Sequence, residues 1–304
     1  MQDNSAKAGI LMAIAAYSMW GFAPMYFKLI QAVPAVEILM HRIIWSVVVL
    51  AALVVVMGHK DRVRAALKSP KVLKILLISG LLLAGNWLLF IWAINSNHLL
   101  DASLGYYINP LLNVLLGYLF LGERLRRNQQ IAVAIALVGV SYLVISYGQL
   151  PWIALVLAGS FGVYGLLRKQ VAVDSLPGLF IETCMMTPFA IAYWIWFAGS
   201  TSNFAENTVS HDVLLACAGI VTTAPLLCFT AAAKRLMYST LGFFQYIGPS
   251  IMFLLAVFVY DEGLQMDRLI TFGFVWTALA LFSYDSYAQF RQKRKLQRAA
   301  LAAE

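Results

Sequence analysis

The chain alternates between long uncharged runs of apolar residues and short segments that carry almost all of its charge. A helix needs about 20 apolar residues to cross the hydrocarbon core of a bilayer, and these runs reach or approach that length. The pattern predicts an all-α polytopic membrane protein with ten transmembrane helices, near residues 8–29, 36–58, 73–95, 99–121, 129–147, 151–170, 176–198, 212–233, 239–260 and 267–289.

Two stretches could be divided in more than one way. The uncharged run from Asn128 to Leu167 contains 40 residues, and one helix of that length would be far longer than a bilayer is thick. We therefore expect two helices that turn at residues 148–151. Near the N-terminus, residues 13–15 loosely fit a signal-peptide cleavage site. The apolar run continues well past them, so we expect a retained first span.

Composition agrees with a membrane protein. The chain has 304 residues, 62% hydrophobic and 12% charged, with a mean hydropathy of +0.78, whereas about 25% of residues are charged in soluble domains. The net charge of +8 does not predict nucleic-acid binding, because the basic residues lie in short segments between apolar runs. Cys184, Cys217 and Cys228 all fall inside apolar runs and form no CxxC pair, so neither a disulfide framework nor a metal site is expected.

The basic residues are distributed unevenly between the two sides of the expected bundle. With the N-terminus in the cytoplasm, only Lys28, Arg42 and Arg268 of the 22 lysines and arginines lie on or near the far side. The expected outer loops near 96–98, 148–150 and 199–211 contain none. The positive-inside rule therefore places both termini in the cytoplasm.

Several motifs recur along the chain. Pro110, Glu123 and Leu125 match Pro249, Glu262 and Leu264 at a constant offset of 139, and residues 20–28 match 161–169 at an offset of 141. We interpret this as two repeats of five spans, 7–147 and 151–290, followed by a basic cytoplasmic tail, 291–304. Because five is odd, the second repeat must enter the membrane from the opposite side, an architecture that many secondary transporters use.

The fourth expected span carries amides in an otherwise apolar run. Asn109 and Asn113 are four residues apart, so they share a helix face with Tyr106, and Pro110 lies between them. We expect this stripe to line a substrate pathway opposite Gln245 and Tyr246, with Pro110 and Pro249 as hinges. The alternative is that the amides form hydrogen bonds between helices.

Charged residues within the spans allow two interpretations each. Arg42 lies inside an apolar run with Glu37 nearby, either as a local ion pair with Glu37 or as a substrate anchor or gate. Glu37 and Glu182 correspond at an offset of 145, and both are candidates for proton coupling, although Glu182 could equally be structural. Asn86, Trp87 and Trp20 complete the candidate pathway, in which aromatic rings and amides would suit amphipathic organic molecules.

Signatures of catalysis are missing from the sequence. It has no GxxxxGK, GxGxxG, HExxH or GxSxG pattern, and its four histidines are scattered. We therefore expect no enzymatic activity, no cofactor and no metal.

The whole chain resembles the RarD-type permeases, in the EamA branch of the drug/metabolite transporter superfamily. The residues that carry the resemblance are WGFAPMYFK (20–28), GNWLLFIWA (85–93), ASLGYYINP (102–110), LGERLRR (121–127), TTAPLLCFTAAA (222–233) and STLGFFQYIGP (239–249). The resemblance implies a bacterial inner-membrane protein of ten helices in two inverted EamA repeats. Such proteins are commonly associated with chloramphenicol, and relatives export amino acids and metabolites. Residues 261–263, Asp-Glu-Gly, depart from the usual Gly-Glu, so the outer turn there is expected to differ.

These patterns together predict a secondary transporter that moves a small organic solute such as an amino acid, a metabolite or an amphipathic drug by alternating access. The expected spans one, three, four, six, eight and nine would surround its cavity. A channel or a scaffold in contact with membrane lipid, without coupled transport, is the alternative. The sequence leaves the cargo, the driving force and the oligomeric state open.

Overall fold

The computed structural model describes residues 2–95, 99–259 and 266–301, and every regular element within these ranges is a helix. The elements are α1 (Gln2–Leu29), α2 (Ala35–Val56), α3 (Lys60–Leu67), α4 (Pro70–Asn95), α5 (Leu99–Leu121), α6 (Arg127–Tyr147), α7 (Trp152–Gln170), α8 (Ser175–Phe197), the 3-10 turn η1 (Ser200–Ser202), α9 (Val209–Ala233), α10 (Tyr238–Gln245), α11 (Ile247–Phe258) and α12 (Met266–Leu301). The all-α prediction is confirmed for this part of the chain. Glu262, Leu264 and residues 96–98 lie outside the described residues.

Nine helices of the described ranges are long and apolar enough to cross a membrane. They account for every predicted span except 239–260, which the structure divides into α10 and α11. Pro249 is the third residue of α11, where its missing N–H removes no intrahelical bond. Pro110, in contrast, lies inside a continuous α5, so the two prolines do not mark equivalent breaks.

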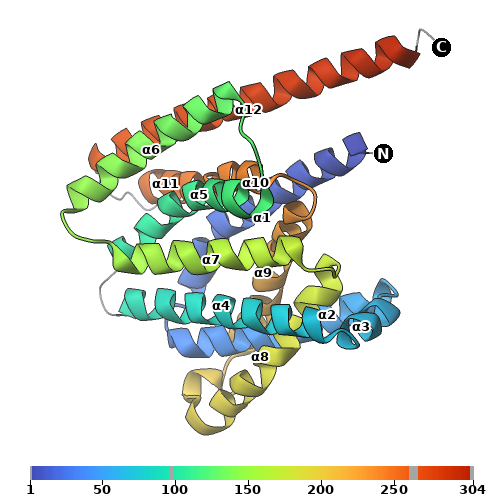
Figure 1. The fold of residues 1–304 in the computed structure, drawn as a ribbon. Coiled ribbons are helices and arrows are strands. Elements are labelled where there is room, and N and C mark those ends of the chain that lie inside the picture. Colours follow the sequence, from blue (N-terminus) through green and yellow to red (C-terminus); the bar gives the residue numbers. More distant parts are fainter. Residues whose placement is uncertain (1, 96–98, 260–265, 302–304) are drawn as a thin grey trace.

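The helices stack in layers, in which α4 and α7 run roughly parallel and α9 is inclined to them (Figure 1). The pair α6 and α12 forms one edge, and α8 forms the opposite edge. Between them, α5, α10, α11 and α1 lie above α7 and α9, with α4 and α2 below. The start of α1 and the end of α12 lie on the same side of the bundle.

Helix contacts cross between the two halves of the chain. Helix α1 of the first half packs against α9 and α11 of the second half. Helix α7 of the second half packs against α4 and α5 of the first half. If the helices of each half are numbered as spans, the first span of either half therefore contacts the third and fourth spans of the other. The halves also meet through α2 with α8 and through α6 with α12.

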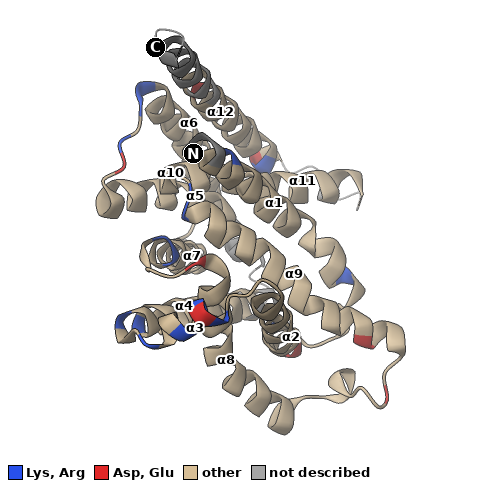
Figure 2. Ribbon diagram, turned by 90° about the vertical axis from the view of Figure 1, so that its right-hand side faces the viewer, with Lys and Arg blue, Asp and Glu red and all other residues tan. Residues whose placement is uncertain are grey.

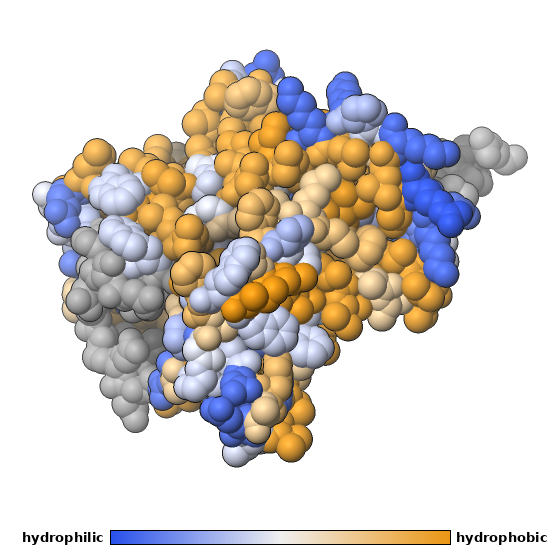
Figure 3. Space-filling view, turned by 90° about the horizontal axis from the view of Figure 1, so that it is seen from below, coloured by the Kyte–Doolittle hydropathy of each residue, from blue (hydrophilic) through white to orange (hydrophobic). Residues whose placement is uncertain are grey.

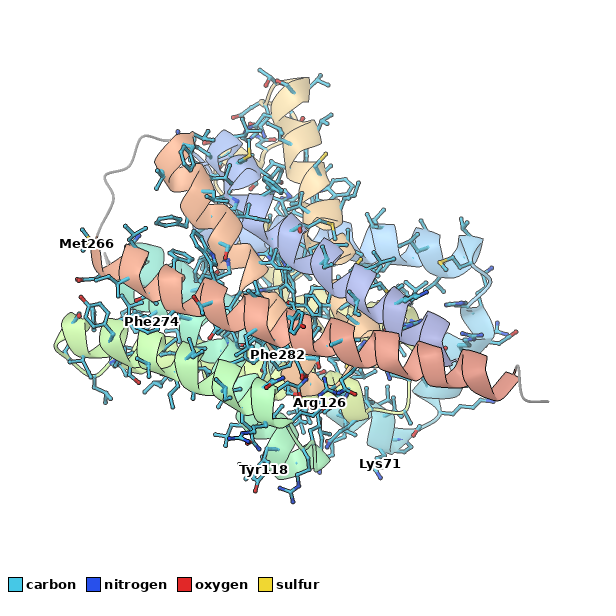
Figure 4. All side chains as sticks on the ribbon, turned by 90° about the horizontal axis from the view of Figure 1, so that it is seen from above. Lys71, Tyr118, Arg126, Met266, Phe274 and Phe282 are labelled. Atoms are coloured by element: carbon cyan, nitrogen blue, oxygen red, sulfur yellow. The ribbon has the colours of Figure 1, made fainter. Side chains whose placement is uncertain are left out.

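An ion pair joins the edge helices α6 and α12, and ring stacking attaches α12 to α10. At one end, Arg126 bonds Asp285 (Nε to Oδ2, 2.8 Å), and Asn128 donates to the other carboxylate oxygen. Viewed from above, α12 crosses the bundle, with Arg126 close to it (Figure 4). The ring of Phe282 stacks on Phe243 of α10 with centroids 3.9 Å apart, which attaches the edge pair to the core.

The surface separates an apolar belt from a basic end. Viewed from below, apolar side chains cover most of the face, and hydrophilic ones gather at the end where α1 begins (Figure 3). A view onto that end shows lysines and arginines on α3 and in the segment before α6 (Figure 2). Many large apolar side chains are exposed, which suits contact with lipid.

Close helix packing depends on glycine where α9 meets α2. A Cβ at Gly219 would lie 2.5 Å from the carbonyl carbon of Trp45 and 2.6 Å from its oxygen. Small residues allow this kind of backbone approach between membrane helices.

We expect Gly219→Ala to separate α2 from α9 and to cost about 1–3 kcal/mol, because backbone atoms cannot move aside as a flexible side chain can. The measurement is the melting temperature in detergent. Gly159→Ala is the matched control, since a Cβ there meets nothing within 4 Å. Equal melting of the two variants would contradict this account of α2–α9 packing.

Candidate substrate cavity

A cavity of about 210 Å³ lies between the two halves of the bundle. Both halves contribute to its lining, which is Tyr17, Trp20, Ala23, Pro24 and Phe27 of α1, Arg42 of α2, Asn86, Trp87 and Phe90 of α4, Gly105, Tyr106 and Asn109 of α5, Leu157, Ala158 and Phe161 of α7, Leu226 of α9, Gln245 of α10, and Gly248, Pro249 and Met252 of α11. The helices are those expected from the sequence, with α2 added through Arg42.

The cavity amides are held by neighbouring helices. Asn86 donates to the carbonyl of Leu157 and to the Ser160 hydroxyl, both at 2.8 Å, and Asn109 donates to the carbonyl of Ala158 at 2.7 Å. These bonds attach α4 and α5 to α7. The sequence predicted both asparagines in the pathway, and the structure places them on the cavity wall.

Asn113 lies behind the wall rather than on it. Its side chain is fully buried, and its Nδ2 donates to Asn109 Oδ1 at 3.1 Å and to Gln245 Oε1 at 2.9 Å. Asn113 therefore connects the two lining amides across the interface of the halves. Its bond to Gln245 is an interhelical hydrogen bond, the alternative that the sequence left open, whereas its bond to Asn109 lies within α5.

Tyr246 also lies outside the lining. The residue is fully buried, its hydroxyl donates to the Tyr107 carbonyl at 3.2 Å, and its ring packs beside Phe243. Asn113 and Tyr246 were both expected to line the pathway, and neither belongs to the cavity lining in this structure. Tyr246 follows Gln245 at the break between α10 and α11, so the two side chains point in different directions.

Arg42 enters the cavity and is not paired with Glu37. Its Nε donates to Thr222 Oγ1 at 2.9 Å, and its Cζ lies 4.2 Å from the ring centroid of Trp87 and 5.6 Å from that of Phe27. Within the described ranges Arg42 forms no ion pair. The ion-pair interpretation of Arg42 and Glu37 is therefore wrong, because the two side chains contact different elements.

Glu37 instead binds the turn that follows α8. Its carboxylate accepts from the Gly199 backbone N–H and the Thr201 hydroxyl, both at 2.8 Å, and from the Ser202 hydroxyl. The Ser202 hydroxyl also contacts His41 Nε2 at 3.1 Å. Three donors on one carboxylate fix η1 against the start of α2.

Glu182 lies in a neighbouring buried cluster. It accepts from the Ser79 hydroxyl at 2.7 Å, and Arg168 Nε lies 3.8 Å from its other oxygen. Both Glu182 and Arg168 are fully buried, and Arg168 Nε, Arg168 Nη1 and Glu182 Oε2 have no hydrogen-bond partner. The pair is close enough for attraction but is incompletely satisfied.

One end of the cavity is closed by contacts that the sequence analysis did not assign to the site. The Glu123 carboxylate accepts from the backbone N–H groups of Tyr238 and Ser239, at 2.5 and 2.8 Å, and from the Ser239 hydroxyl at 2.7 Å. It thereby caps the start of α10, where backbone N–H groups lack intrahelical partners. Glu123 stood out in the sequence only as part of the repeated motif.

Lysines complete this closure. Lys169 Nζ donates to the carbonyls of Ala233 and Leu236, and Lys234 Nζ donates to the Val171 carbonyl at 2.8 Å, so α7 and α9 are joined in both directions. Burial lowers the pKa of the Lys234 ammonium. The Tyr238 hydroxyl donates to the Gly162 carbonyl at 2.6 Å, above these contacts. These contacts tie together the ends of α7, α9 and α10, and none of their residues belongs to the cavity lining itself.

We expect the effects of Glu37→Gln and Arg42→Gln on melting temperature to add in the double variant, because Glu37 holds η1 and Arg42 contacts α9. Glu37→Gln alone should lower the melting temperature, since an amide offers only one acceptor oxygen. Glu206→Gln in the exposed loop is the control. Non-additive shifts would mean that the two side chains interact after all.

Comparisons with known proteins agree with this arrangement. Residues 7–145 match the EamA-like transporter family. The chain is 58% identical to an uncharacterized transporter of Vibrio cholerae, over 93% of this chain and 94% of that protein. It is 52% identical to Protein RarD of Salmonella typhimurium, over 96% of this chain and the whole of that protein.

More distant relatives extend the comparison. A Pseudomonas aeruginosa protein named chloramphenicol-sensitive protein RarD is 30% identical, over 94% of this chain and 97% of that protein. A solved crystal structure superposes with a TM-score of 0.71 at 20% identity, covering 90% of this chain and 96% of the other, which supports the fold alone. The chain is a multi-pass bacterial membrane protein, and it belongs to the RarD group of the EamA-like transporter family, within the drug/metabolite transporter superfamily.

Proposed function

We propose that this protein is a secondary transporter of the bacterial inner membrane that exports a small organic solute by alternating access. The observation that carries the proposal is the cavity itself. It lies between the halves, is lined by aromatic rings, amides and one arginine, and is sealed at one end by polar contacts. A site of this kind binds a solute without chemical change, in keeping with the expected absence of catalysis.

Two inverted repeats, 7–147 and 151–290, would explain how the site alternates. The contacts between the halves support a pseudo-two-fold relation. Helix α1 contacts α9 and α11, and its counterpart α7 makes the matching contacts with α4 and α5. In such an arrangement, breaking contacts on one side while forming their counterparts on the other reverses access. The basic tail, 291–304, would follow the second repeat on the cytoplasmic side.

The side to which the cavity faces follows from orientation. The positive-inside rule assigns the basic end, with the start of α1 and the end of α12, to the cytoplasm. Phe27, Phe90 and Tyr106 lie near the opposite ends of their helices, so the cavity is nearer the periplasm. Glu123, Lys169 and Lys234 then close the cytoplasmic side, and the conformation is outward-directed.

A channel is the alternative function. The seal below the cavity argues against a continuous pore, since Tyr17, Phe229 and Tyr164 pack together between the cavity and the capped start of α10. A scaffold would not need a cavity that contains an arginine. The cargo itself remains within the classes named above. Chloramphenicol-like drugs are included because a relative's name mentions chloramphenicol.

Proton coupling, if the transporter uses it, would involve Glu182 rather than Glu37. Glu37 already accepts three hydrogen bonds that fix η1, which gives its carboxylate a structural role. Glu182 is fully buried with an incompletely satisfied partner, and Leu179, Thr183 and Met186 beside it line a small pocket that Arg42 also reaches.

We expect reconstituted protein to show saturable counterflow of at least one solute from a screen of amino acids, carboxylic metabolites and amphipathic drugs. A carrier exchanges labelled for unlabelled solute across liposomes, whereas a channel cannot accumulate label in this way. Protein heated above its melting temperature is the control. Conductance in planar bilayers without counterflow would favour the channel.

The orientation and the closure can be tested together by cysteine labelling, in a background that lacks the three native cysteines. We expect a membrane-impermeant reagent added outside to label cysteines replacing Gly148 or Ala23, but not one replacing Arg127. Ala23 lines the cavity and Gly148 lies between α6 and α7. Labelling of Gly148 and Arg127 positions from one side would refute the inverted arrangement.

In the same assay, Glu123→Gln should slow outside labelling at position 23. Loss of the Glu123 carboxylate weakens the proposed cytoplasmic seal. The ratio of outward-open to inward-open molecules then falls roughly tenfold for each 1.4 kcal/mol of stabilisation lost. Glu206→Gln, in an exposed loop, should leave the rate unchanged. An unchanged rate in Glu123→Gln would mean that this carboxylate does not control access.

A further inference from the structure

We infer that the cargo is an organic monoanion, a carboxylate on a flat apolar body, whose charged group binds the guanidinium of Arg42. This inference rests on the proposed transport function and specifies its substrate class. It begins with the charge of the cavity. Of the residues that line the cavity, Arg42 alone carries a charge at neutral pH.

Other charged groups near the cavity have partners of their own. Glu182 shares a smaller neighbouring pocket with Arg42, but its carboxylate is engaged by Ser79 and lies beside Arg168. Glu37 is directed to Gly199, Thr201 and Ser202. Arg42 is therefore a cation within apolar surroundings that no carboxylate of the described residues neutralises. Placing such a charge there costs free energy of desolvation unless a ligand or water forms hydrogen bonds with it.

The geometry of Arg42 leaves its outer donors available. Nε donates to Thr222, and within the described part of the chain the two terminal nitrogens have no hydrogen-bond partner, although neither nitrogen is fully buried. They are therefore open to the cavity. Trp87, with its ring centroid 4.2 Å from Cζ, holds the guanidinium plane in position. Two adjacent N–H donors in a fixed plane match the two oxygens of a carboxylate.

The rest of the lining suits an apolar body with few polar groups. Trp20 and Phe161 meet edge to face with centroids 5.8 Å apart, and Phe90 and Tyr106 do so at 6.1 Å, which provides aromatic walls on two sides. Gln245 accepts from Asn113 through Oε1, so its amide N–H groups remain as further donors to the cavity. No acidic side chain lines the cavity to receive an amine, so a positive group on the cargo is not required.

This charge arrangement has a consequence for energetics. Binding a monoanion neutralises Arg42, so the loaded cavity is nearly neutral while the empty one carries a positive charge. Export then removes one negative charge from the cell per cycle. The membrane potential, negative inside, favours the complete cycle by roughly 50-fold in concentration ratio per 100 mV, because it draws the positively charged empty cavity back toward the cytoplasm.

Binding of matched probes tests the inference directly. The probes are benzoate, 3-phenylpropanoate and indole-3-acetate, each paired with its neutral amide of nearly the same shape, and binding is measured by calorimetry on purified protein. We expect at least one carboxylate to bind, and to bind more tightly than its amide. Arg42→Gln should weaken carboxylate binding roughly 10- to 100-fold and leave amide binding unchanged.

Two further variants separate charge from structure. Arg42→Lys keeps the charge but loses the planar donor pair, so its carboxylate affinity should fall between those of wild type and Arg42→Gln. Arg62→Gln removes a cation from an exposed ion pair with Asp174, and should change nothing. Unchanged amide binding in Arg42→Gln would exclude a collapsed cavity as the cause.

Three results would overturn the inference. They are amides that bind as tightly as carboxylates, equal loss of both in Arg42→Gln, and failure of every carboxylate to bind. Counterflow of a neutral solute that survives Arg42→Gln would overturn the anion inference and leave the transporter standing. Absence of counterflow for every solute, with carboxylate binding intact, would overturn the transport function instead.

Discussion

Polar side chains among apolar helices must find their partners on neighbouring helices, because neither lipid nor packed core supplies hydrogen bonds. This constraint arranges the interior of the bundle. Asn86 and Asn109 use carbonyls of α7, Asn113 uses two other amides, and Glu37 uses the donors of residues 199–202. Apart from the bond between Asn113 and Asn109 within α5, each of these bonds joins elements that are distant in sequence. Arg168 and Glu182 are buried with this requirement incompletely met, whereas, among the described residues, the two terminal nitrogens of Arg42 lack such partners without being fully buried.

The same constraint explains how one side of the bundle closes. The start of α10 would leave backbone N–H groups without partners. Glu123, which lies just after the end of α5, supplies the acceptor. The ends of α7 and α9 leave carbonyls without partners, and Lys169 and Lys234 supply the donors. Helix termini on this side are thus satisfied by long side chains from other elements.

Much of the fold follows from the sequence, for identifiable reasons. Runs without charge predict helices that the structure contains, and the turn at residues 148–151 was predictable because 40 uncharged residues exceed one crossing. The break at Tyr246 was only partly predictable, since a proline indicates a disturbed helix but not its form: Pro110 sits in a continuous helix and Pro249 follows a break. The short helix α3 has a mixed polar pattern that hydropathy alone does not identify.

Site residues were harder to predict than helices. Helical spacing shows which residues share a face, but not which other part of the chain packs against that face. Asn109 and Asn113 share a stripe, yet one lines the cavity and the other lies behind it, where the partner Gln245 comes from residues more than a hundred positions away. Arg42 and Glu37 were close enough in sequence to suggest pairing. The partners that decided otherwise, Thr222 and the turn at 199–202, are equally remote along the chain.

Arg42 also makes the cavity less symmetric than the arrangement of the helices that surround it. Under the offset of 145 that relates Glu37 to Glu182, the counterpart of Arg42 is Thr187, whose hydroxyl donates to the carbonyl of Thr183 within its own helix, α8. In the proposed arrangement of two repeats, Arg42 therefore has no charged counterpart in the second repeat. A solute bound through one charged end would keep that end against α2 in both states, without turning over as the helices rock past it. The movement could then belong equally to both halves of the molecule, while the choice of solute belongs to the first half alone.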